Sequence, residues 1–194
     1  MRLTKYFKSG LIGRMAILKG EDKLLEKYAA LAGDHVEIGC LWGGTAILAA
    51  LAKINAGVKG HVYSIDKMSG GYWERGDPGV DYTTPTEERV RRNIERMGVQ
   101  DRITVIRADS NPLPLPSKVK PVTVLIDGAH SFDGCLRDWE NVKRLAPKFV
   151  LFHDYGTGKH PGVQAVVDEH VRKDAGWELV DQEQTMLAFR RVQA

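Results

Sequence analysis

Short runs of β-branched and apolar residues alternate with stretches of helical periodicity along most of the chain, and this alternation limits the folds available to it. Each run is bounded by charge or glycine, and the runs lie at residues 35–38, 62–65, 103–106, 122–126 and 149–152. Apolar residues at helical spacing lie at 24–31, 46–54, 87–97, 133–147 and 163–172. This order predicts a parallel sheet that is covered by helices on both faces.

The C-terminal part of the chain departs from this alternation of predicted strands and helices. Two further strand-like runs, 177–180 and 186–189, are separated by a polar segment that is too short for a crossover helix. They should therefore pair as an antiparallel hairpin. We predict an α/β fold with a doubly wound, Rossmann-like sheet of seven strands, mostly parallel, whose antiparallel element is this hairpin. Asp133 is the expected N-cap of the fourth helix.

Nothing in the sequence marks a domain boundary, so we expect one domain over residues 1–194. Residues 1–20 form an N-terminal extension whose apolar side chains could cover a pocket or a second copy of the chain in a homo-oligomer. Residues 68–86 are rich in glycine, proline and aromatic residues. A segment of this length within a compact domain is usually functional, so we interpret it as a lid or substrate loop.

Composition excludes several classes of partner. The chain has 28 Lys and Arg against 25 Asp and Glu, and a net charge of +3 is too weak to predict nucleic-acid binding. No apolar run is long enough to predict a membrane span or a signal peptide. The two cysteines, Cys40 and Cys135, match no zinc or redox spacing. We therefore expect a cytoplasmic protein without a nucleic-acid or membrane partner.

A glycine-rich turn follows the first predicted strand, where α/β sheets bind nucleotide-like ligands. The turn contains Gly39, Gly43 and Gly44, and Asp66 ends the next strand, where a carboxylate can accept hydrogen bonds from ribose hydroxyls. A dinucleotide fingerprint requires a glycine at the position of Leu41. A nicotinamide-dependent oxidoreductase is therefore a weaker alternative, and a noncatalytic cofactor-binding protein of the same fold is another.

Five motifs, each at the end of a predicted strand, resemble those of class I S-adenosylmethionine-dependent methyltransferases. The similarity spans most of the chain and is greatest to the small-molecule branch that has Asp-Gly-x-His-Ser and His-Asp-Tyr signatures. The motifs are Glu37-Ile-Gly-Cys-Leu-Trp-Gly-Gly-Thr45, Asp66, Ala108-Asp-Ser110, Asp127-Gly-Ala-His-Ser131 and His153-Asp-Tyr155. The resemblance implies a methyltransferase that acts on a small molecule, with O-methylation favoured.

The resemblance also implies the residues that bind S-adenosylmethionine. Those expected around its methionyl and ribose groups are Gly39, Cys40, Gly43, Gly44 and Thr45. Glu37 would orient this loop or bind the methionine ammonium group, and Asp66 would bind the ribose. Asp109 and Ser110 would lie near the adenine.

A second group of candidate residues, Asp127, His130, His153 and Asp154, follows the fourth and fifth predicted strands. These strand ends should converge beside the cofactor pocket. In one interpretation Asp127, His153 and Asp154 hold a divalent metal, Mg²⁺ or another ion, that activates an acceptor hydroxyl. In the other, His130 or His153 is the general base and a neighbouring aspartate orients it. Asp127, His130 and His153 are the predicted catalytic residues, and His160 could also reach the substrate.

Overall fold

The computed structural model describes residues 16–68 and 86–192. Its helices are α2 (Glu21–Ala29), α3 (Gly44–Asn55), α4 (Glu87–Arg96), α5 (Phe132–Arg144) and α6 (Pro161–Val166), the last continuing as a π-helical turn, Val167–Val171. Its strands are β1 (Asp34–Ile38), β2 (Val62–Asp66), β3 (Ile103–Arg107), β4 (Pro121–Ile126), β5 (Phe149–Phe152), β6 (Trp177–Glu183) and β7 (Met186–Arg191). The expected lid, apart from residues 68 and 86, and residues 1–15 of the expected extension lie outside the described residues.

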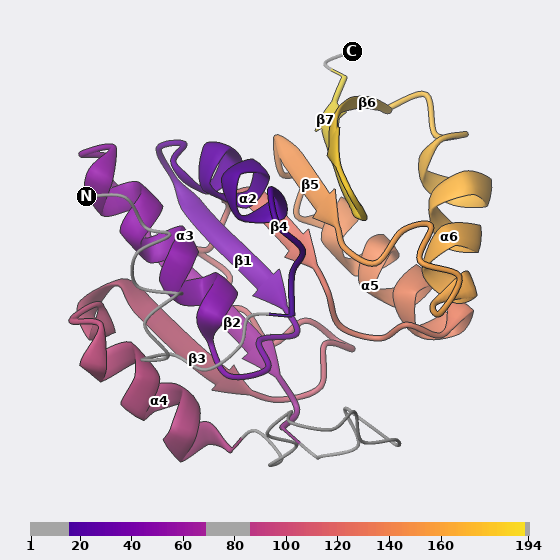
Figure 1. The fold of residues 1–194 in the computed structure, drawn as a ribbon. Coiled ribbons are helices and arrows are strands. Elements are labelled where there is room, and N and C mark those ends of the chain that lie inside the picture. Colours follow the sequence, from indigo (N-terminus) through magenta and orange to yellow (C-terminus); the bar gives the residue numbers. More distant parts are fainter. Residues whose placement is uncertain (1–15, 69–85, 193–194) are drawn as a thin grey trace.

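The seven strands form one sheet in the order β3-β2-β1-β4-β5-β7-β6 (Figure 1). All pairs among β1 to β5 are parallel, whereas β7 pairs antiparallel with both β5 and β6. The predicted fold, with its C-terminal hairpin, is confirmed. The six-residue strand β7 lies between β5 and β6, so the hairpin joins the parallel part of the sheet through β7.

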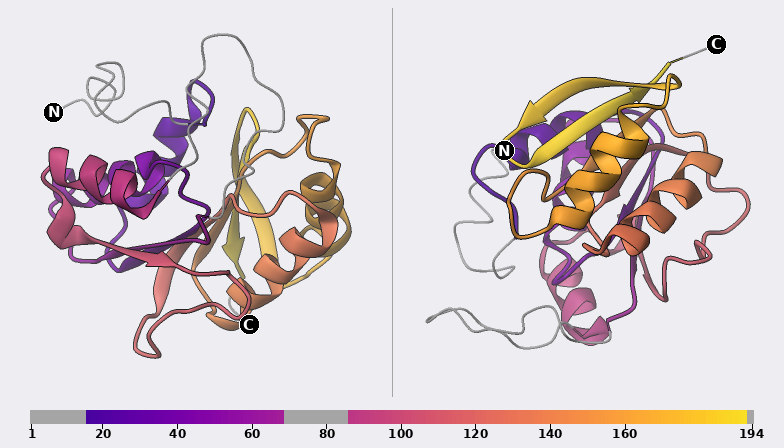
Figure 2. Two further views of the ribbon diagram at one scale, coloured as in Figure 1. Left: turned by 90° about the horizontal axis from the view of Figure 1, so that it is seen from below. Right: turned by 90° about the vertical axis from the view of Figure 1, so that its right-hand side faces the viewer.

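Helices cover both faces of the sheet, as Figure 2 shows. On one face, α2 and α3 pack Leu24 and Leu48 against Leu125 and Leu151 of the sheet, and α4 packs beside α3. On the other face, α5 and α6 bury a core of aromatic and β-branched side chains that includes Trp139. The burial of both faces explains why β4 and β5 are almost continuously apolar.

The start of α5 differs from the prediction. Ser131, rather than Asp133, is the N-cap, and its hydroxyl oxygen accepts a hydrogen bond from the Gly134 amide at 3.3 Å. The expectation for Asp133 was wrong because the helix begins two residues earlier, at Phe132, which leaves Asp133 within the first turn. A carboxylate there still interacts favourably with the positive end of the helix dipole.

The strand register brings the candidate residues together at one edge of the sheet, the edge formed by the carboxyl ends of the parallel strands. Ile38 pairs with both Ile65 and Ile126, and Ile126 pairs with Phe152. Because these parallel strands end side by side, the residues that follow them are neighbours in space. None of the described helices is long and apolar enough to cross a lipid bilayer.

Candidate active site

The loop after β1 adopts a conformation that depends on glycine. Gly39 has φ +89°, and a Cβ atom there would lie 2.0 Å from the carbonyl oxygen of Asp127. Gly43 has φ +82° and is the N-cap of α3. The left-handed conformation and the close approach of two backbones both require a residue without a side chain. Gly39 thereby brings the end of β1 into contact with the end of β4.

Asp66 holds this loop in place. Its Oδ2 accepts hydrogen bonds from the amides of Cys40 at 2.8 Å and Leu41 at 3.4 Å, and its Oδ1 accepts one from the Met68 amide at 2.7 Å. The side chain is buried, with 5% of its surface exposed. Asp66 therefore organises the glycine loop from the neighbouring strand, a role that the sequence analysis did not assign to it.

Glu37 lies fully buried beneath the same loop. The Ser64 hydroxyl donates to its Oε1 at 2.6 Å, and its Oε2 has no hydrogen-bond partner among the described residues. Burial raises the pKa of Glu37 to about 8, against the opposing effect of Ser64 and Thr45. At neutral pH the free protein thus holds a mostly protonated carboxyl group here, next to Thr45 in the first turn of α3.

The two residues expected near the adenine have local partners. Asp109 is exposed after β3, where its Oδ1 accepts a hydrogen bond from the Asn111 amide at 3.0 Å. The Ser110 hydroxyl donates to Asp138 of α5, and the Ser110 carbonyl accepts from the Asn141 side chain at 3.3 Å. These contacts attach the end of β3 to α5.

His153 is the centre of a buried charge cluster at the end of β5. Its Nδ1 lies 3.1 Å from Oδ1 of Asp127 and 3.5 Å from Oδ2 of Asp154, and its Nε2 lies 3.0 Å from Oε2 of Glu21. Glu21 also accepts hydrogen bonds from the amide and hydroxyl of Thr185, at 2.8 and 2.7 Å. The first residue of α2 therefore links His153 to the turn of the β6–β7 hairpin.

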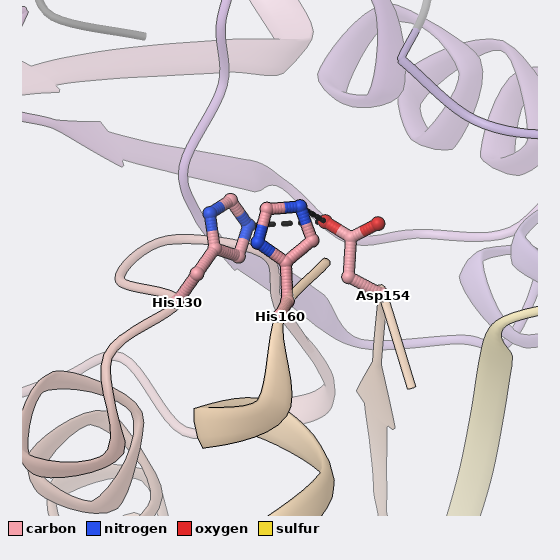
Figure 3. A group of neighbouring side chains, drawn as sticks. All are labelled: His130, Asp154 and His160. Atoms are coloured by element: carbon pink, nitrogen blue, oxygen red, sulfur yellow. Dashed lines mark ion pairs between the residues drawn. The ribbon is translucent and has the colours of Figure 1, made fainter. Parts of the chain in front are cut away.

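A second, more accessible group adjoins this cluster: His130, Asp154 and His160 (Figure 3). Nε2 of His130 lies 3.0 Å from Oδ2 of Asp154, and Nε2 of His160 lies 3.7 Å from the same oxygen. The two imidazole rings are tilted by 31° to each other, with centroids 4.0 Å apart. Asp154 has φ +66°, a conformation that is uncommon outside glycine and often marks functional sites.

The ionisation of these groups follows from their contacts. Burial alone would lower the pKa of His153, but Asp127 and the other carboxylates raise it to about 12. Burial opposes ionisation of Glu21, but hydrogen bonds from His153 and Thr185 lower its pKa to about 2. The carboxylates of Asp127 and Asp154 raise the pKa of His130 to about 9. Burial and the nearby His130 lower the pKa of His160.

The structure thus brings together the predicted residues Asp127, His130, His153 and Asp154, and adds two others. Sequence reasoning missed Glu21 because it belongs to no motif and lies far from the strand ends along the chain. His160 was considered only as a residue that could reach substrate. A weak signal for its position exists in the glycines and proline around it, which predict a tight turn after β5.

Two sets of these donors are arranged so that they could hold a metal ion. In each set, Asp127 with His153 and Asp154, and His130 with Asp154 and His160, the ligand atoms lie within 4.8 Å of one another. Glu21 is an acceptor for the Nε2 proton of His153, which leaves Nδ1 facing Asp127 and Asp154. A carboxylate on the distal nitrogen is the common arrangement for a metal-binding histidine.

Comparisons with known proteins identify the family of the chain. Residues 36–155 match the model of a family described as a methyltransferase domain. No curated protein sequence matches the chain significantly.

Several solved structures share the fold. The O-methyltransferase NovP is 19% identical, with a TM-score of 0.71 over 89% of this chain and 80% of that one. An O-methyltransferase from Bacillus cereus, in complex with SAH, is 14% identical, with a TM-score of 0.62 over 97% of this chain and 88% of that one. The calicheamicin methyltransferase CalS11 is 13% identical, with a TM-score of 0.64 over 97% and 82% of the two chains.

Proposed function

Because the chain belongs to the methyltransferase domain family whose model covers residues 36–155, we propose that it transfers a methyl group from S-adenosylmethionine to a hydroxyl group of a small molecule. The observation that carries the proposal is the shared edge of the sheet, where the glycine loop and the acid–histidine cluster meet at the contact of Gly39 with Asp127. This edge can hold a cofactor and an acceptor side by side.

The proposed cofactor site lies on the β1 and β2 side of this edge. Its residues are Glu37, Gly39, Cys40, Gly43, Gly44, Thr45, Asp66, Asp109 and Ser110. The amides at the start of α3 suit the carboxylate end of the methionyl group. Asp66 fixes the loop through the Cys40 and Leu41 amides and is proposed to bind the ribose as well.

The proposed acceptor site lies on the β4 and β5 side. Methyl transfer from a sulfonium requires in-line positioning of the acceptor and removal of its proton, because the electrophile is already activated. Asp127, His130 and His153 are the catalytic residues we place around the acceptor hydroxyl. The ion pairs among them fix their positions: His153 lies between Asp127 and Glu21, and His130 lies beside Asp154.

The donor set Asp127, His153 and Asp154 could hold a divalent cation, Mg²⁺ or another ion, once His153 has lost the Nδ1 proton that it carries in the free protein, and we propose these residues as its ligands. A bound cation would lower the pKa of an acceptor hydroxyl and stabilise the alkoxide. Without a cation, we propose His130, which Asp154 orients, as the general base. Because its pKa is raised to about 9, His130 must first lose its own proton, and activity by this route should increase as the pH rises toward 9. Activity measured in EDTA distinguishes the two routes. Activity that persists in EDTA would indicate that the histidine, and not a cation, removes the proton of the acceptor hydroxyl.

The small-molecule class of acceptor is supported by the names of similar structures, among them an O-methyltransferase and a calicheamicin methyltransferase. A net charge of +3 argues against nucleic acid as the acceptor. Leu41, at a position where dinucleotide-binding turns require glycine, argues against a nicotinamide cofactor.

Calorimetric titration of the purified protein with S-adenosylhomocysteine and with NAD tests the proposal. We expect S-adenosylhomocysteine to bind and NAD not to bind. Binding of NAD alone would refute the proposal and favour an oxidoreductase. Binding of S-adenosylhomocysteine without transfer of labelled methyl groups to any hydroxyl compound in a broad panel would favour a noncatalytic cofactor-binding protein.

A further inference from the structure

We propose that His130, Asp154 and His160 form a site for a first-row transition-metal ion, with two imidazole nitrogens and one carboxylate oxygen as ligands. This inference rests on the proposed function, because it gives the acceptor side of the active site a cation of a particular chemical class. It differs from the strand-end set of Asp127, His153 and Asp154 in its use of His160 and in the metal that it selects.

Both histidines make ion pairs with the same oxygen of Asp154, as Figure 3 shows. Nε2 of both histidines faces Oδ2 of Asp154, at 3.0 Å from His130 and 3.7 Å from His160. Ligands that bind one ion at about 2.1 Å lie roughly 3 to 4 Å apart. The two distances to Asp154 fall in this range, and all three donor atoms lie within 4.8 Å of one another.

The His130 nitrogen lies against a carboxylate without an aligned hydrogen bond. Nε2 of His130 is inaccessible to solvent and has no aligned hydrogen-bond partner among the described residues, although it lies 3.0 Å from Asp154. A cation between the nitrogen and the carboxylate would satisfy both groups.

The fold places the two histidines together through a glycine. Gly162 lies in the first turn of α6, and a Cβ atom there would lie 2.4 Å from the Phe132 amide nitrogen and 2.5 Å from the His130 carbonyl oxygen. Both atoms belong to the backbone and cannot move aside cheaply. Gly162 therefore allows α6 to begin directly against the loop after β4, which brings His160 onto His130.

The composition of the set favours nitrogen-preferring ions. Mg²⁺ prefers an octahedron of oxygen atoms, whereas two imidazoles with one carboxylate suit Fe²⁺, Co²⁺, Ni²⁺ or Zn²⁺. The rings are also accessible, because the side chains of His130 and His160 keep 40% and 29% of their surfaces exposed. A bound ion would thus retain open positions toward the side from which an acceptor could approach.

Titration with Co²⁺ tests this site without relying on activity. We expect one Co²⁺ to bind with a visible absorption spectrum that indicates nitrogen ligands, and we expect Zn²⁺, but not an excess of Mg²⁺, to displace it. The H160Q substitution should weaken Co²⁺ binding by at least the roughly 10- to 100-fold that is lost when a supporting residue of a metal site is removed. The H61Q variant is the matched control, because His61 contacts Thr104 at the opposite edge of the sheet.

Three outcomes would overturn the inference. Co²⁺ binding that H160Q leaves unchanged but D127N abolishes would place the cation at the strand-end set instead. Equal competition by Mg²⁺ would indicate an oxygen-ligand site. Absence of Co²⁺ binding in a protein that binds S-adenosylhomocysteine would refute this site and leave the methyltransferase proposal intact. Failure to bind S-adenosylhomocysteine would instead count against the proposed function.

Discussion

Replacement of Asp66 by asparagine separates the cofactor role of this carboxylate from its structural role. The two oxygens accept hydrogen bonds from the Cys40 amide at 2.8 Å and the Met68 amide at 2.7 Å. An asparagine of the same size offers only one oxygen, so its NH₂ group must face one of these buried amides. One unsatisfied amide is unfavourable by about 1–3 kcal/mol.

This loss predicts two measurable effects of Asp66→Asn. In a chain of this size the thermal midpoint should fall by roughly 2–12 °C, at about 2–4 °C for each kcal/mol. Loss of one hydrogen bond between the ribose and the charged carboxylate, at about 1.5–3 kcal/mol, should weaken S-adenosylhomocysteine binding roughly 10- to 150-fold. Differential scanning calorimetry and titration calorimetry measure the two effects on the same samples.

Asp34→Asn is the matched control. Asp34 begins β1 at the opposite edge of the sheet, where its Oδ1 accepts a hydrogen bond from the His61 amide at 2.9 Å. Because only one oxygen of Asp34 is used, asparagine can keep this hydrogen bond, so the control should retain both its stability and its affinity for S-adenosylhomocysteine. If Asp66→Asn also leaves the affinity unchanged, Asp66 supports the loop only, and its assignment to the ribose is refuted.

Three further substitutions test other parts of the site. The urea midpoint of unfolding should be lower for Gly39→Ala than for Gly57→Ala. Alanine at either position must adopt a positive φ, which is unfavourable by about 1–2 kcal/mol, but only at Gly39 would its Cβ atom also collide with another backbone. Glu37 has its pKa raised to about 8 by burial, so its contribution to stability is present below about pH 4.5 and is lost as the pH rises through 8. Denaturation at pH 5 and pH 8 should accordingly show that Glu37→Gln makes stability less dependent on pH, and an unchanged dependence would contradict the buried, protonated state. Glu21→Gln should lower the methyl-transfer rate constant more than the affinity for S-adenosylhomocysteine, because Glu21 touches His153 and not the glycine loop. Asp181→Asn, which breaks the exposed Lys27 ion pair between α2 and β6, should change neither quantity in the same assays.

Most of the fold could be predicted because its determinants are local. The parallel strands and their helices follow from the alternation of short apolar runs with helical stripes, and the polar segment between residues 180 and 186 indicates the hairpin. The N-cap of α5 was misassigned because Ser131 and Asp133 are both good capping residues within three positions. Only the structure decides which of two adjacent caps begins the helix.

The candidate site was predictable where residues follow directly after strands. Asp127, His130, His153 and Asp154 meet because parallel strands end at one edge. Glu21 could not be found in this way, because its contact with His153 joins residues 132 positions apart in the chain. The contact depends on how α2 packs across the sheet, which no local pattern encodes.

A crystal structure of the protein with S-adenosylhomocysteine tests the central claim most directly. We predict that the ribose binds beside Asp66, that the methionyl group lies along the loop from Gly39 to Thr45, and that the sulfur faces Asp127 and His130. The donor and acceptor sites would then meet at the contact between β1 and β4. Electron density for the ligand elsewhere, or a sulfur that points away from the cluster of acids and histidines, would contradict this account.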